Sequence, residues 1–423
     1  MVHPIKTLLM AMRNLLRGGR RTVSTLLAIT VGLVGLTLLD GYITYSMNGL
    51  RETVIHSGTG HLQVVKSPAF FDEGDTDPFP FMLDRANDIE KALRAMPEVK
   101  DVVPGLSFTA VVSANGKTST VLVTALPIDR ASANLSDRGI DRGKDLASGE
   151  SGRILVGRGV ARKLGLAPND SLSLFALSRD GGVNTQSYTI SGTTASIIAA
   201  LDNVSVFMDL GDAQSLIGND TVREYPFGEY AVPQLIVFLR STADTARVTH
   251  ALRGAAAGSA LSGLTVRTWE ELSPYYRQAN SAYQLVLAVA RLIVLIVALF
   301  SISGTLSLAV MERLREVGTL RAFGTRRPRV LFMLVFEGLI LGIGGALIGC
   351  LAGAAVSGLI NVLGGITMPP QPGTSSAFRI LFTPEVSKFF ANAGWVLAAS
   401  LVGALFPGML ASRRKIADLL RAQ

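Results

Sequence analysis

Four stretches of the chain are almost free of charged side chains, and each is long enough to cross a membrane. They are residues 22–39, 292–311, 338–379 and 391–412. About 20 residues in a helix, rising about 1.5 Å each, span a hydrocarbon core roughly 30 Å thick. The third stretch, extended back to residue 330, exceeds one helix length. It predicts a helix over about residues 329–359, followed by a loop rich in glycine and proline at residues 364–373.

The first stretch has two readings, because basic residues precede it, as they do in a secretory signal peptide. It is long for the apolar core of a signal peptide, and no small-x-small cleavage site follows it. Tyr42 and Tyr45 come where interfacial aromatic residues are expected. We retain it as a span. The predicted fold class is therefore an α-helical membrane protein with four transmembrane helices and a large mixed α/β extracytoplasmic domain between helices 1 and 2.

Before the first span, apolar residues recur at intervals of three and four. They are Ile5, Leu8, Leu9, Met12, Leu15 and Leu16. Lys6, Arg13 and Arg17 fall on other faces, so the pattern predicts an amphipathic helix along the inner membrane surface, stopped by Gly18 and Gly19. The alternative is a plain cytosolic extension of the first span.

These patterns divide the chain into nine consecutive segments. They are an interfacial helix and N-terminus (1–21), the first span (22–47), an outer domain (48–281), a second span with a stalk (282–311), a short charged helix (312–328), the third span (329–360), an outer loop (361–390), the fourth span (391–412) and a tail (413–423).

The outer domain alternates strand-like and helix-like segments. Residues 109–123 predict two strands around Asn115-Gly116, a dipeptide typical of type I′ hairpin turns. Helical patterns cover residues 88–96 and 242–257, a strand leading into a helix covers residues 154–166, and further strands cover residues 234–240 and 264–268. We expect a membrane-proximal subdomain formed by residues 48–130 and 230–281, with a second subdomain, residues 131–229, inserted into it.

Composition agrees with a membrane protein, since 48% of the residues are hydrophobic and only 17% are charged. The three segments outside the spans on one side, residues 1–21, 312–329 and 413–423, carry 15 basic and 3 acidic residues. The outer domain carries 22 basic and 26 acidic residues. By the positive-inside rule, both termini and the short connection are cytoplasmic and the large domain is outside. The net charge of +8 therefore reflects topology, and nucleic-acid binding is not predicted.

Candidate enzyme chemistry is sparse. Cys350 is the only cysteine, and the four histidines do not have the spacing of zinc ligands, so no disulfide within the chain, metal site or cofactor is predicted. Gly116-Lys117-Thr118 looks like the end of a phosphate-binding loop, but position 111 is valine where that motif needs glycine. We do not expect the chain to be an enzyme or to hydrolyse ATP alone.

The connection between the second and third spans is the most informative short segment. Glu312 and Glu316 are four apart, which places them on one face if the segment is helical, and Arg313, Arg315 and Arg321 surround them. A short charged helix of this kind can dock in a groove of a soluble partner. Gly318 and Gly324 would allow close approach and a turn at its end. Taken alone, the segment fits a solvated loop equally well.

The same segment, ERLREVGTLRAFGT at residues 312–325, closely resembles the loop motif of FtsX/MacB-type ABC transporter permeases. NLLR at residues 14–17, with the Arg20-Arg21 pair, is similar to their N-terminal signature, and ILVGRGVARKLG at 154–165 is similar to their middle-domain strand and helix. GTGHLQV at residues 58–64 resembles the start of the outer domain in the lipoprotein-releasing, LolC/LolE-like branch. The tail departs from the family pattern, because residues 407–421 lack a second proline.

The resemblance implies an assembly of two permease chains, as a homodimer or heterodimer, with two copies of an ABC ATPase that holds ATP and Mg. ATPase closure would move the cytoplasmic connection, and the helices would carry that motion to the outer domain. The site implied for ATPase coupling consists of Glu312, Arg313, Arg315, Glu316, Gly318, Arg321 and Gly324. The implied location is the bacterial inner membrane, with a periplasmic outer domain and a periplasmic chaperone or adaptor as a further partner.

In this family the substrate cavity lies between the first and second spans near the outer leaflet. By resemblance, its candidate lining residues are Leu39, Tyr42, Ile43, Met47, Tyr283, Leu287 and Val294, and ordinary packing or lipid contact is the alternative. Small residues at spacing four in the third span allow close helix packing, either in a dimer or within one chain. They are Gly338, Gly342, Gly345, Gly349 and Gly353. Arg291 and Glu337, both inside or near spans, have either a structural or a functional role.

Three functions follow from the resemblance. The first is extraction or release of lipoprotein or other lipid-anchored cargo from the inner membrane, by mechanical coupling to ATP hydrolysis. The second is export of a small molecule or peptide with an adaptor and an outer-membrane duct. The third is activation of a periplasmic cell-wall hydrolase, which the large outer domain disfavours.

Overall fold

A computed structural model describes residues 19–131, 139–195, 199–218, 232–254, 259–323, 327–368 and 378–413. The chain forms two compact units. We call Met1–Asn48, Gln278–Thr367 and Arg379–Gln423 the membrane unit, and Gly49–Arg277 with Met368–Phe378 the extracytoplasmic unit. The predicted interfacial helix at residues 1–21 falls almost entirely outside the described residues, as do Gly324 and the tail after residue 413.

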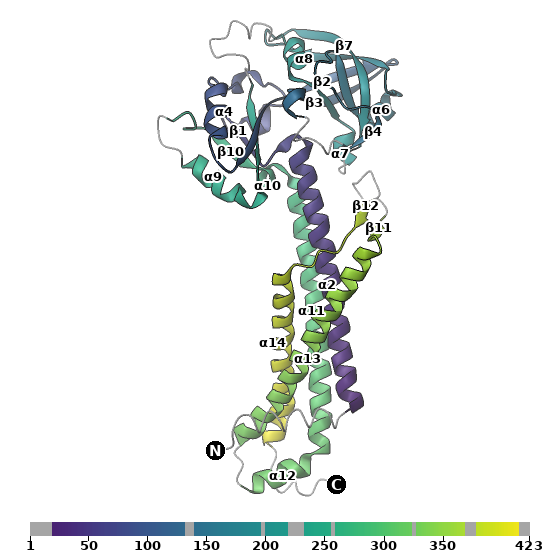
Figure 1. Cartoon of the computed structure of the whole chain (residues 1–423), viewed down its shortest axis with the longest axis vertical. Helices are drawn as coiled ribbons and strands as arrows, with labels where there is room; N and C mark the ends of the chain where they lie inside the picture. The colour runs from purple at the N-terminus through teal and green to yellow at the C-terminus, as the bar shows by residue number, and fades with distance from the viewer. Residues whose placement is uncertain are drawn as a thin grey trace. The chain divides into compact units, whose positions relative to one another are not determined.

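Four long apolar helices build the membrane unit. They are α2 (Gly19–Val54), α11 (Pro274–Glu312), α13 (Arg327–Val362) and α14 (Val386–Arg413), with the short helix α12 (Leu314–Ala322) between α11 and α13 (Figure 1). Each long helix meets the length and hydropathy needed to cross a bilayer. Their shared core includes Ile29, Leu33, Ile302 and Val396, all buried. The four predicted spans are confirmed.

All four helices extend beyond the predicted spans, and α2 and α11 do so by the most residues. α2 continues to Val54 and leads into a π-helical turn, η1 (Ile55–Thr59), and α11 starts at Pro274 in the segment that we assigned to the outer domain. The sequence gives no break there, because apolar length predicts the part of a helix that lies in the bilayer rather than its ends. After α13, the short strands β11 (Ile366–Met368) and β12 (Phe378–Ile380) pair before α14 begins.

The predicted charged helix at residues 312–328 is wrong in its bounds. Glu312 is the last residue of α11, the backbone breaks at Arg313 with φ −115° and ψ 18°, and α12 then runs only from Leu314 to Ala322. Glu312 and Glu316 therefore belong to different helices, and the shared helical face predicted for them does not exist. α13 begins at Arg327, two residues earlier than predicted.

The extracytoplasmic unit alternates strands and short helices around one sheet. Its elements in chain order are β1 (Leu62–Val65), α3 (Phe70–Glu73), η2 (Phe79–Phe81), α4 (Ala86–Arg94), β2 (Val99–Ala114), β3 (Lys117–Leu126), α5 (Ile128–Ala131), β4 (Ile140–Gly143), β5 (Arg153–Gly157), α6 (Arg158–Leu164), β6 (Ser171–Leu177), β7 (Val183–Thr194), α7 (Ala199–Asp202), β8 (Ser205–Asp209), α8 (Leu210–Leu216), β9 (Gln234–Leu239), η4 (Thr242–Asp244), α9 (Thr245–Arg253), β10 (Thr265–Thr268) and α10 (Trp269–Leu272). The mixed α/β fold predicted for this region is confirmed.

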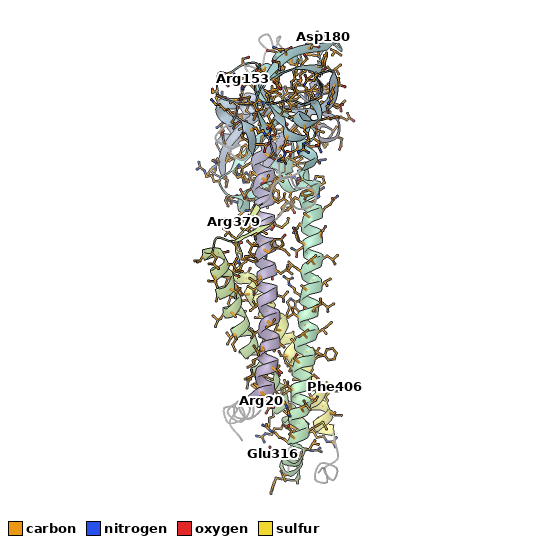
Figure 2. All side chains as sticks on the ribbon, turned by 90° about the vertical axis from the view of Figure 1, so that its right-hand side faces the viewer. Arg20, Arg153, Asp180, Glu316, Arg379 and Phe406 are labelled. Atoms are coloured by element: carbon orange, nitrogen blue, oxygen red, sulfur yellow. The ribbon has the colours of Figure 1, made fainter. Side chains whose placement is uncertain are left out.

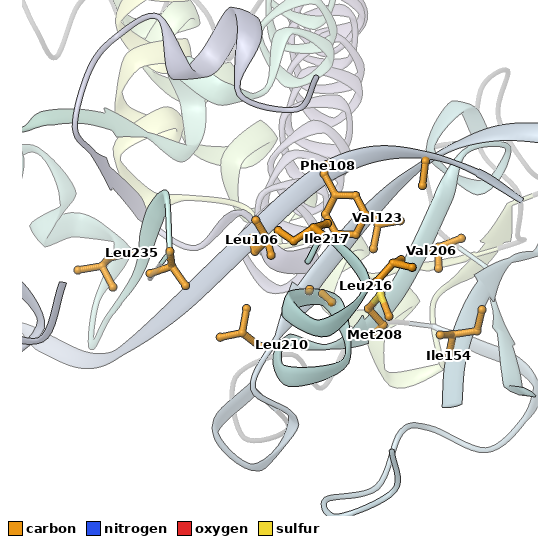
Figure 3. Packing of buried hydrophobic residues seen from close by; sticks show 14 of the residues in the cluster. Leu106, Phe108, Val123, Ile154, Val206, Met208, Leu210, Leu216, Ile217 and Leu235 are labelled. Carbon is orange, nitrogen blue, oxygen red and sulfur yellow. The ribbon is translucent and has the colours of Figure 1, made fainter. Parts of the chain in front are cut away.

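The strands follow the order β10-β1-β9-β2-β3-β8-β5-β7-β4, and β6 pairs with both β2 and β7. The strands β2, β3, β8, β5, β7 and β6 thus close into a ring, which leaves no free edge among them. Leu106, Phe108, Val123, Ile154 and Met208 fill its interior, and α8 packs on the same core (Figure 3). The first half of β2 pairs instead with β9, so the sheet is continuous between the two predicted subdomains.

The hairpin predicted at Asn115-Gly116 is confirmed. Ala114 and Lys117 close the β2–β3 register, and both turn residues have positive φ, 52° at Asn115 and 71° at Gly116, as a type I′ turn requires. Asn115 also donates a hydrogen bond to the carbonyl of Leu164 at the end of α6, 3.1 Å away. A residue favoured for its backbone conformation therefore also joins the hairpin to a helix.

The edge strand β10, at one end of the sheet, is protected from pairing with an added strand. On the edge strand β10, Arg253 donates to the Val266 carbonyl at 2.9 Å, and the carboxylate of Glu271 accepts from the Thr268 amide at 2.9 Å. Arg253 and Glu271 also form an ion pair at 3.1 Å. Side chains thus occupy backbone groups that an added strand would need.

Candidate functional site

The connection predicted to contact an ATPase is fixed to the membrane unit at its start by two ion pairs. Glu312 accepts from Arg21 of α2 at 2.5 Å, and Arg313 lies 3.7 Å from Glu337 of α13. Glu312 and Arg21 are solvent-exposed, whereas Glu337 is 2% exposed. The backbone break at Arg313 redirects the chain between α11 and α12 and brings this residue to the buried carboxylate of Glu337.

Three exposed residues, two within α12 and one directly after it, lie on one helical face. Glu316, Thr319 and Phe323 are spaced by three and four residues and are all exposed, with Phe323 90% exposed. Gly318 and Arg321, in contrast, are buried. Figure 2 places Glu316 and Arg20 at the same end of the membrane unit. Gly324 and the side chain of Arg315 lie outside what the structure describes.

Phe323 was not among the residues that we predicted to contact a partner. It ends the charged motif as a large apolar side chain directly before Gly324, which is the signal that could have identified it. A phenylalanine exposed at a helix C-terminus, next to a carboxylate on the same face, is typical of a residue that a partner protein covers.

The residues predicted to line a substrate cavity are brought together, but they are packed. Ile43, Met47 and Leu287 are buried, and the rings of Tyr42 and Tyr283 meet edge to face with centroids 6.3 Å apart. Leu39 and Val294 are half-buried, and Val294 lies against Gly32. In the described chain these side chains join α2 to α11, so a cavity there would require the two helices to separate. Their role as a substrate site stays a prediction.

A buried polar group lies at this level of the membrane unit. The sequence pointed to one of its members, Arg291, but not to Asp40 or Asn392. Asp40 of α2 is 2% exposed, and its carboxylate accepts from Arg291 of α11 at 3.3 Å and from Asn392 of α14 at 2.7 Å. Nearby, Lys388 donates to Thr44 at 2.6 Å. Asp40 directly follows the first apolar stretch and reads as its boundary, while its partners are 251 and 352 residues away in sequence. No local pattern reveals this grouping.

The glycines of α13 face two different helices of the same chain. Three of them approach α2: an added Cβ on Gly345, Gly349 and Gly353 would lie 2.7, 2.8 and 2.9 Å from Ile29, Leu33 and Thr37. On Gly338 it would lie 2.6 Å from Cβ of Ala404, and on Gly342 it would lie 2.2 Å from Oγ of Ser400, both on α14. Real Cβ atoms do not approach so closely, so glycine at these positions sets the helix separation.

In the extracytoplasmic unit, one histidine is held in a single tautomer. His61 Nδ1 accepts from the Leu239 amide at 3.2 Å, so Nε2 carries the hydrogen that faces Thr242 Oγ1 at 3.2 Å. Burial, followed by the charge of His56, lowers the pKa of His61 from 6.5 to about 4. The ring of Phe238 packs against both histidines. His61 is thus a neutral structural residue at the start of β1.

The same unit contains a cleft of about 750 Å³. Gln63 and Gln234 come from its sheet, Asp75 follows α3, and Arg267 stacks on the ring of Phe71 with 4.3 Å between the guanidinium carbon and the ring centroid. Within the described ranges, no cluster of three or more histidine, cysteine, aspartate or glutamate residues is arranged to hold a metal ion.

Comparison with known proteins gives two family matches. A model described as MacB-like periplasmic core domain matches residues 22–255, and one described as FtsX-like permease C-terminal matches residues 288–416. The crystal structure of the periplasmic region of MacB from Actinobacillus actinomycetemcomitans covers 54% of this chain and 95% of that chain, at 9% identity and a TM-score of 0.34.

Among curated proteins, the chain is 22% identical to the lipoprotein-releasing system transmembrane protein LolE of Haemophilus influenzae over 407 residues, covering 93% of this chain and 91% of LolE. It is 20% identical over 378 residues to the macrolide export ATP-binding/permease protein MacB of Bradyrhizobium diazoefficiens, covering 85% of this chain but 53% of that protein. The two family models together account for most of the sequence, and the MacB-like model alone covers more than half. The chain belongs to the family of ABC transporter permeases that join a MacB-like periplasmic core domain to an FtsX-like membrane region.

Proposed function

We propose that this chain is the membrane subunit through which a separate cytoplasmic ATPase drives movement of the extracytoplasmic unit, with both chain termini on the ATPase side. Two permease chains and two ATPase copies would form the working assembly, and ATP with Mg would bind only the ATPase. The observation that carries this proposal is a division of the residues around α12 into two sets. Glu312 and Arg313 form ion pairs within the chain, whereas Glu316 and Phe323 are exposed.

This division fits a docking helix. Phe323 would enter an apolar pocket of the ATPase, and Glu316 on the same face would meet a basic side chain there, since buried aromatic anchors beside charged rims dominate such interfaces. The ion pairs of Glu312 with Arg21 and of Arg313 with Glu337 connect the start of α12 to α2 and α13. A displacement of α12 would therefore act on the membrane helices together.

Two helices would carry the displacement outward. α2 and α11 each contain residues of both units. In the extracytoplasmic unit, Val54 at the end of α2 and Tyr276 at the start of α11 pack on one core with Phe238 of β9. Trp269 stacks edge to face on Tyr276, with ring centroids 4.6 Å apart. Both helix ends thus contact the same side chains, which supports transmission by packed contacts.

For the cargo, we propose a lipoprotein or another lipid-anchored molecule. The near full-length match to LolE, whose name assigns it to a lipoprotein-releasing system, supports this choice. Copurification distinguishes the alternatives: a soluble lipoprotein chaperone supports release, whereas an adaptor protein would indicate export and a cell-wall hydrolase would indicate activation of that enzyme. A direct assay is ATP-dependent transfer of an acylated lipoprotein out of vesicles that contain the complex.

The docking proposal is tested by Phe323→Ala, with Phe332→Ala as its matched control. Phe332 is also an exposed phenylalanine, 62% exposed, but lies on α13. We expect Phe323→Ala to weaken ATPase binding to the purified permease at least tenfold, as loss of an aromatic anchor does, and Phe332→Ala to leave it unchanged. Equal ATPase affinity for Phe323→Ala and the unmodified chain would contradict the proposed docking face.

A further inference from the structure

Asp40 is the point where three of the four membrane helices meet through polar groups. Its two carboxylate oxygens have separate partners, Oδ1 accepting from Arg291 of α11 and Oδ2 from Asn392 of α14. Asp40 and Asn392 are 2% and 3% exposed. On one side their surroundings are apolar, because Leu36 and Val396, each about one helical turn away along the same two helices, belong to the buried core of the unit. One turn away on the other side, Lys388 donates to Thr44.

Burying such a charged group in a membrane costs free energy. The group is useful where it fixes a helix arrangement that apolar packing leaves open. Helices that pack through small and aliphatic side chains can slide or rotate against one another with little loss of contact, whereas a buried carboxylate with two partners is satisfied in one register. The glycines of α13 leave that freedom, since they specify close approach to α2 and α14 but make no directional bond. The hydrogen bonds of Asp40 with Arg291 and Asn392 are the directional bonds that the glycines lack.

A second observation is that the group is only partly satisfied. Arg291 Nε and Asn392 Oδ1 are buried and have no hydrogen-bond partner among the described residues. One is a donor and the other an acceptor, and both side chains are already bound to the same carboxylate. Each such unpaired buried group costs free energy, so a shift of the helices that gave either one a partner would be favoured.

We propose that Asp40 is a positioning residue for energy coupling: it ties α11 and α14 to α2, so that these helices move as one set when the ATPase displaces α12. This inference rests on the proposed function. Asp40 does not contact cargo or nucleotide in this account and acts through Arg291 and Asn392.

The experiment uses the permease–ATPase complex in lipid nanodiscs. Cys350 is replaced by alanine, and Lys117→Cys, at the exposed end of the β2–β3 hairpin, carries a spin label on each permease chain. Pulsed electron spin resonance then compares the distance between the two labels in nucleotide-free and ATP-vanadate-trapped complexes. ATP hydrolysis is measured on the same samples, and melting of each variant is followed by circular dichroism.

With Asp40→Asn, which keeps side-chain size and removes the charge, we expect most of the nucleotide-dependent shift in label distance to be lost while hydrolysis continues. Arg291→Lys keeps a cation near Asp40 and should retain most of the shift, whereas Arg291→Gln should lose it. Ser46→Ala is the matched control, because Ser46 Oγ is also buried on α2 and has no partner among the described residues. It should behave as the parent chain.

A full shift in folded Asp40→Asn complexes would overturn the positioning role, as would equal shifts for Arg291→Lys and Arg291→Gln. If Asp40→Asn does not fold, the two Arg291 variants decide in the same way. No nucleotide-dependent shift in the parent complex, with ATPase bound and active, would contradict the proposed function itself and remove the basis of this inference.

Discussion

Glu337 illustrates how a charged residue in an apolar helix can be explained once its partner is known. Its side chain is 3% exposed and lies 3.7 Å from Arg313, which the backbone break after α11 brings towards α13. From sequence alone, Glu337 had either a structural or a functional role, because its partner lies across a turn whose geometry no local pattern specifies. The ion pair favours a structural role for Glu337 at the base of α12, and this role stays a prediction.

Glu337→Gln should therefore destabilise the permease, because it removes the carboxylate charge that pairs with Arg313. We expect a loss of about 1–3 kcal/mol, less than for removal of the whole side chain, because the amide oxygen can still accept a hydrogen bond. The measurement is thermal unfolding of the purified chain in detergent. Ser357→Ala on the same helix removes a buried hydroxyl with no partner in the described chain and should change little. Equal losses in both variants would argue against the ion pair.

His61 predicts a pH dependence confined to the extracytoplasmic unit. Its pKa in the folded chain is about 4, below the usual 6.5, so the unfolded chain takes up the proton first as pH falls. The free energy of unfolding should have its full value above about pH 6.5 and decline towards pH 4, by about 1 kcal/mol or more in total. Below pH 4 both states are protonated, and this residue should cause no further loss.

The fluorescence of Trp269, buried close to His61's neighbour Phe238, reports this unfolding once Trp395 is replaced by phenylalanine. The unfolding temperature should fall between pH 6.5 and pH 4 in the parent chain, and less in His61→Gln. If the two chains showed the same pH dependence, His61 would not be its source.

At the scale of elements, the helices and turns that depend on local sequence pattern could be predicted from the sequence. Apolar length predicted the four spans, and Asn115-Gly116 predicted a hairpin whose turn residues have the required positive φ. The bounds of α12 were wrong because its start depends on Arg313 reaching a carboxylate on another helix. The Asp40 group was missed for the same reason, since its members are distant in sequence.

The contact between α13 and α2 predicts opposite results for two similar substitutions. Gly349→Ala would place a Cβ 2.8 Å from Leu33, whereas Gly358, about two and a half turns further along α13, has open space at that position. We expect Gly349→Ala to destabilise the membrane unit by about 1–3 kcal/mol, as overpacking does, and Gly358→Ala to be neutral. Thermal unfolding in detergent measures both, and a neutral Gly349→Ala would show that α2 and α13 can adjust their separation.

At the scale of the whole molecule, one family match covers the first span with most of the extracytoplasmic region and another covers the other three spans, so the chain combines a periplasmic-type domain with an ABC permease membrane region. Its sequence has no complete phosphate-binding loop, and in the proposed function the exposed face of α12 binds a partner that has one. The proposed function therefore requires a complex of more than one kind of chain.

Native mass spectrometry of the complex, purified through this chain from its own membranes with native lipid, tests that dependence most directly. The account predicts two permease chains with two copies of a separate ABC ATPase, and loss of the ATPase from complexes that carry Phe323→Ala. Recovery of the chain only by itself or with other permease chains, under conditions in which the membrane unit remains folded, would contradict it.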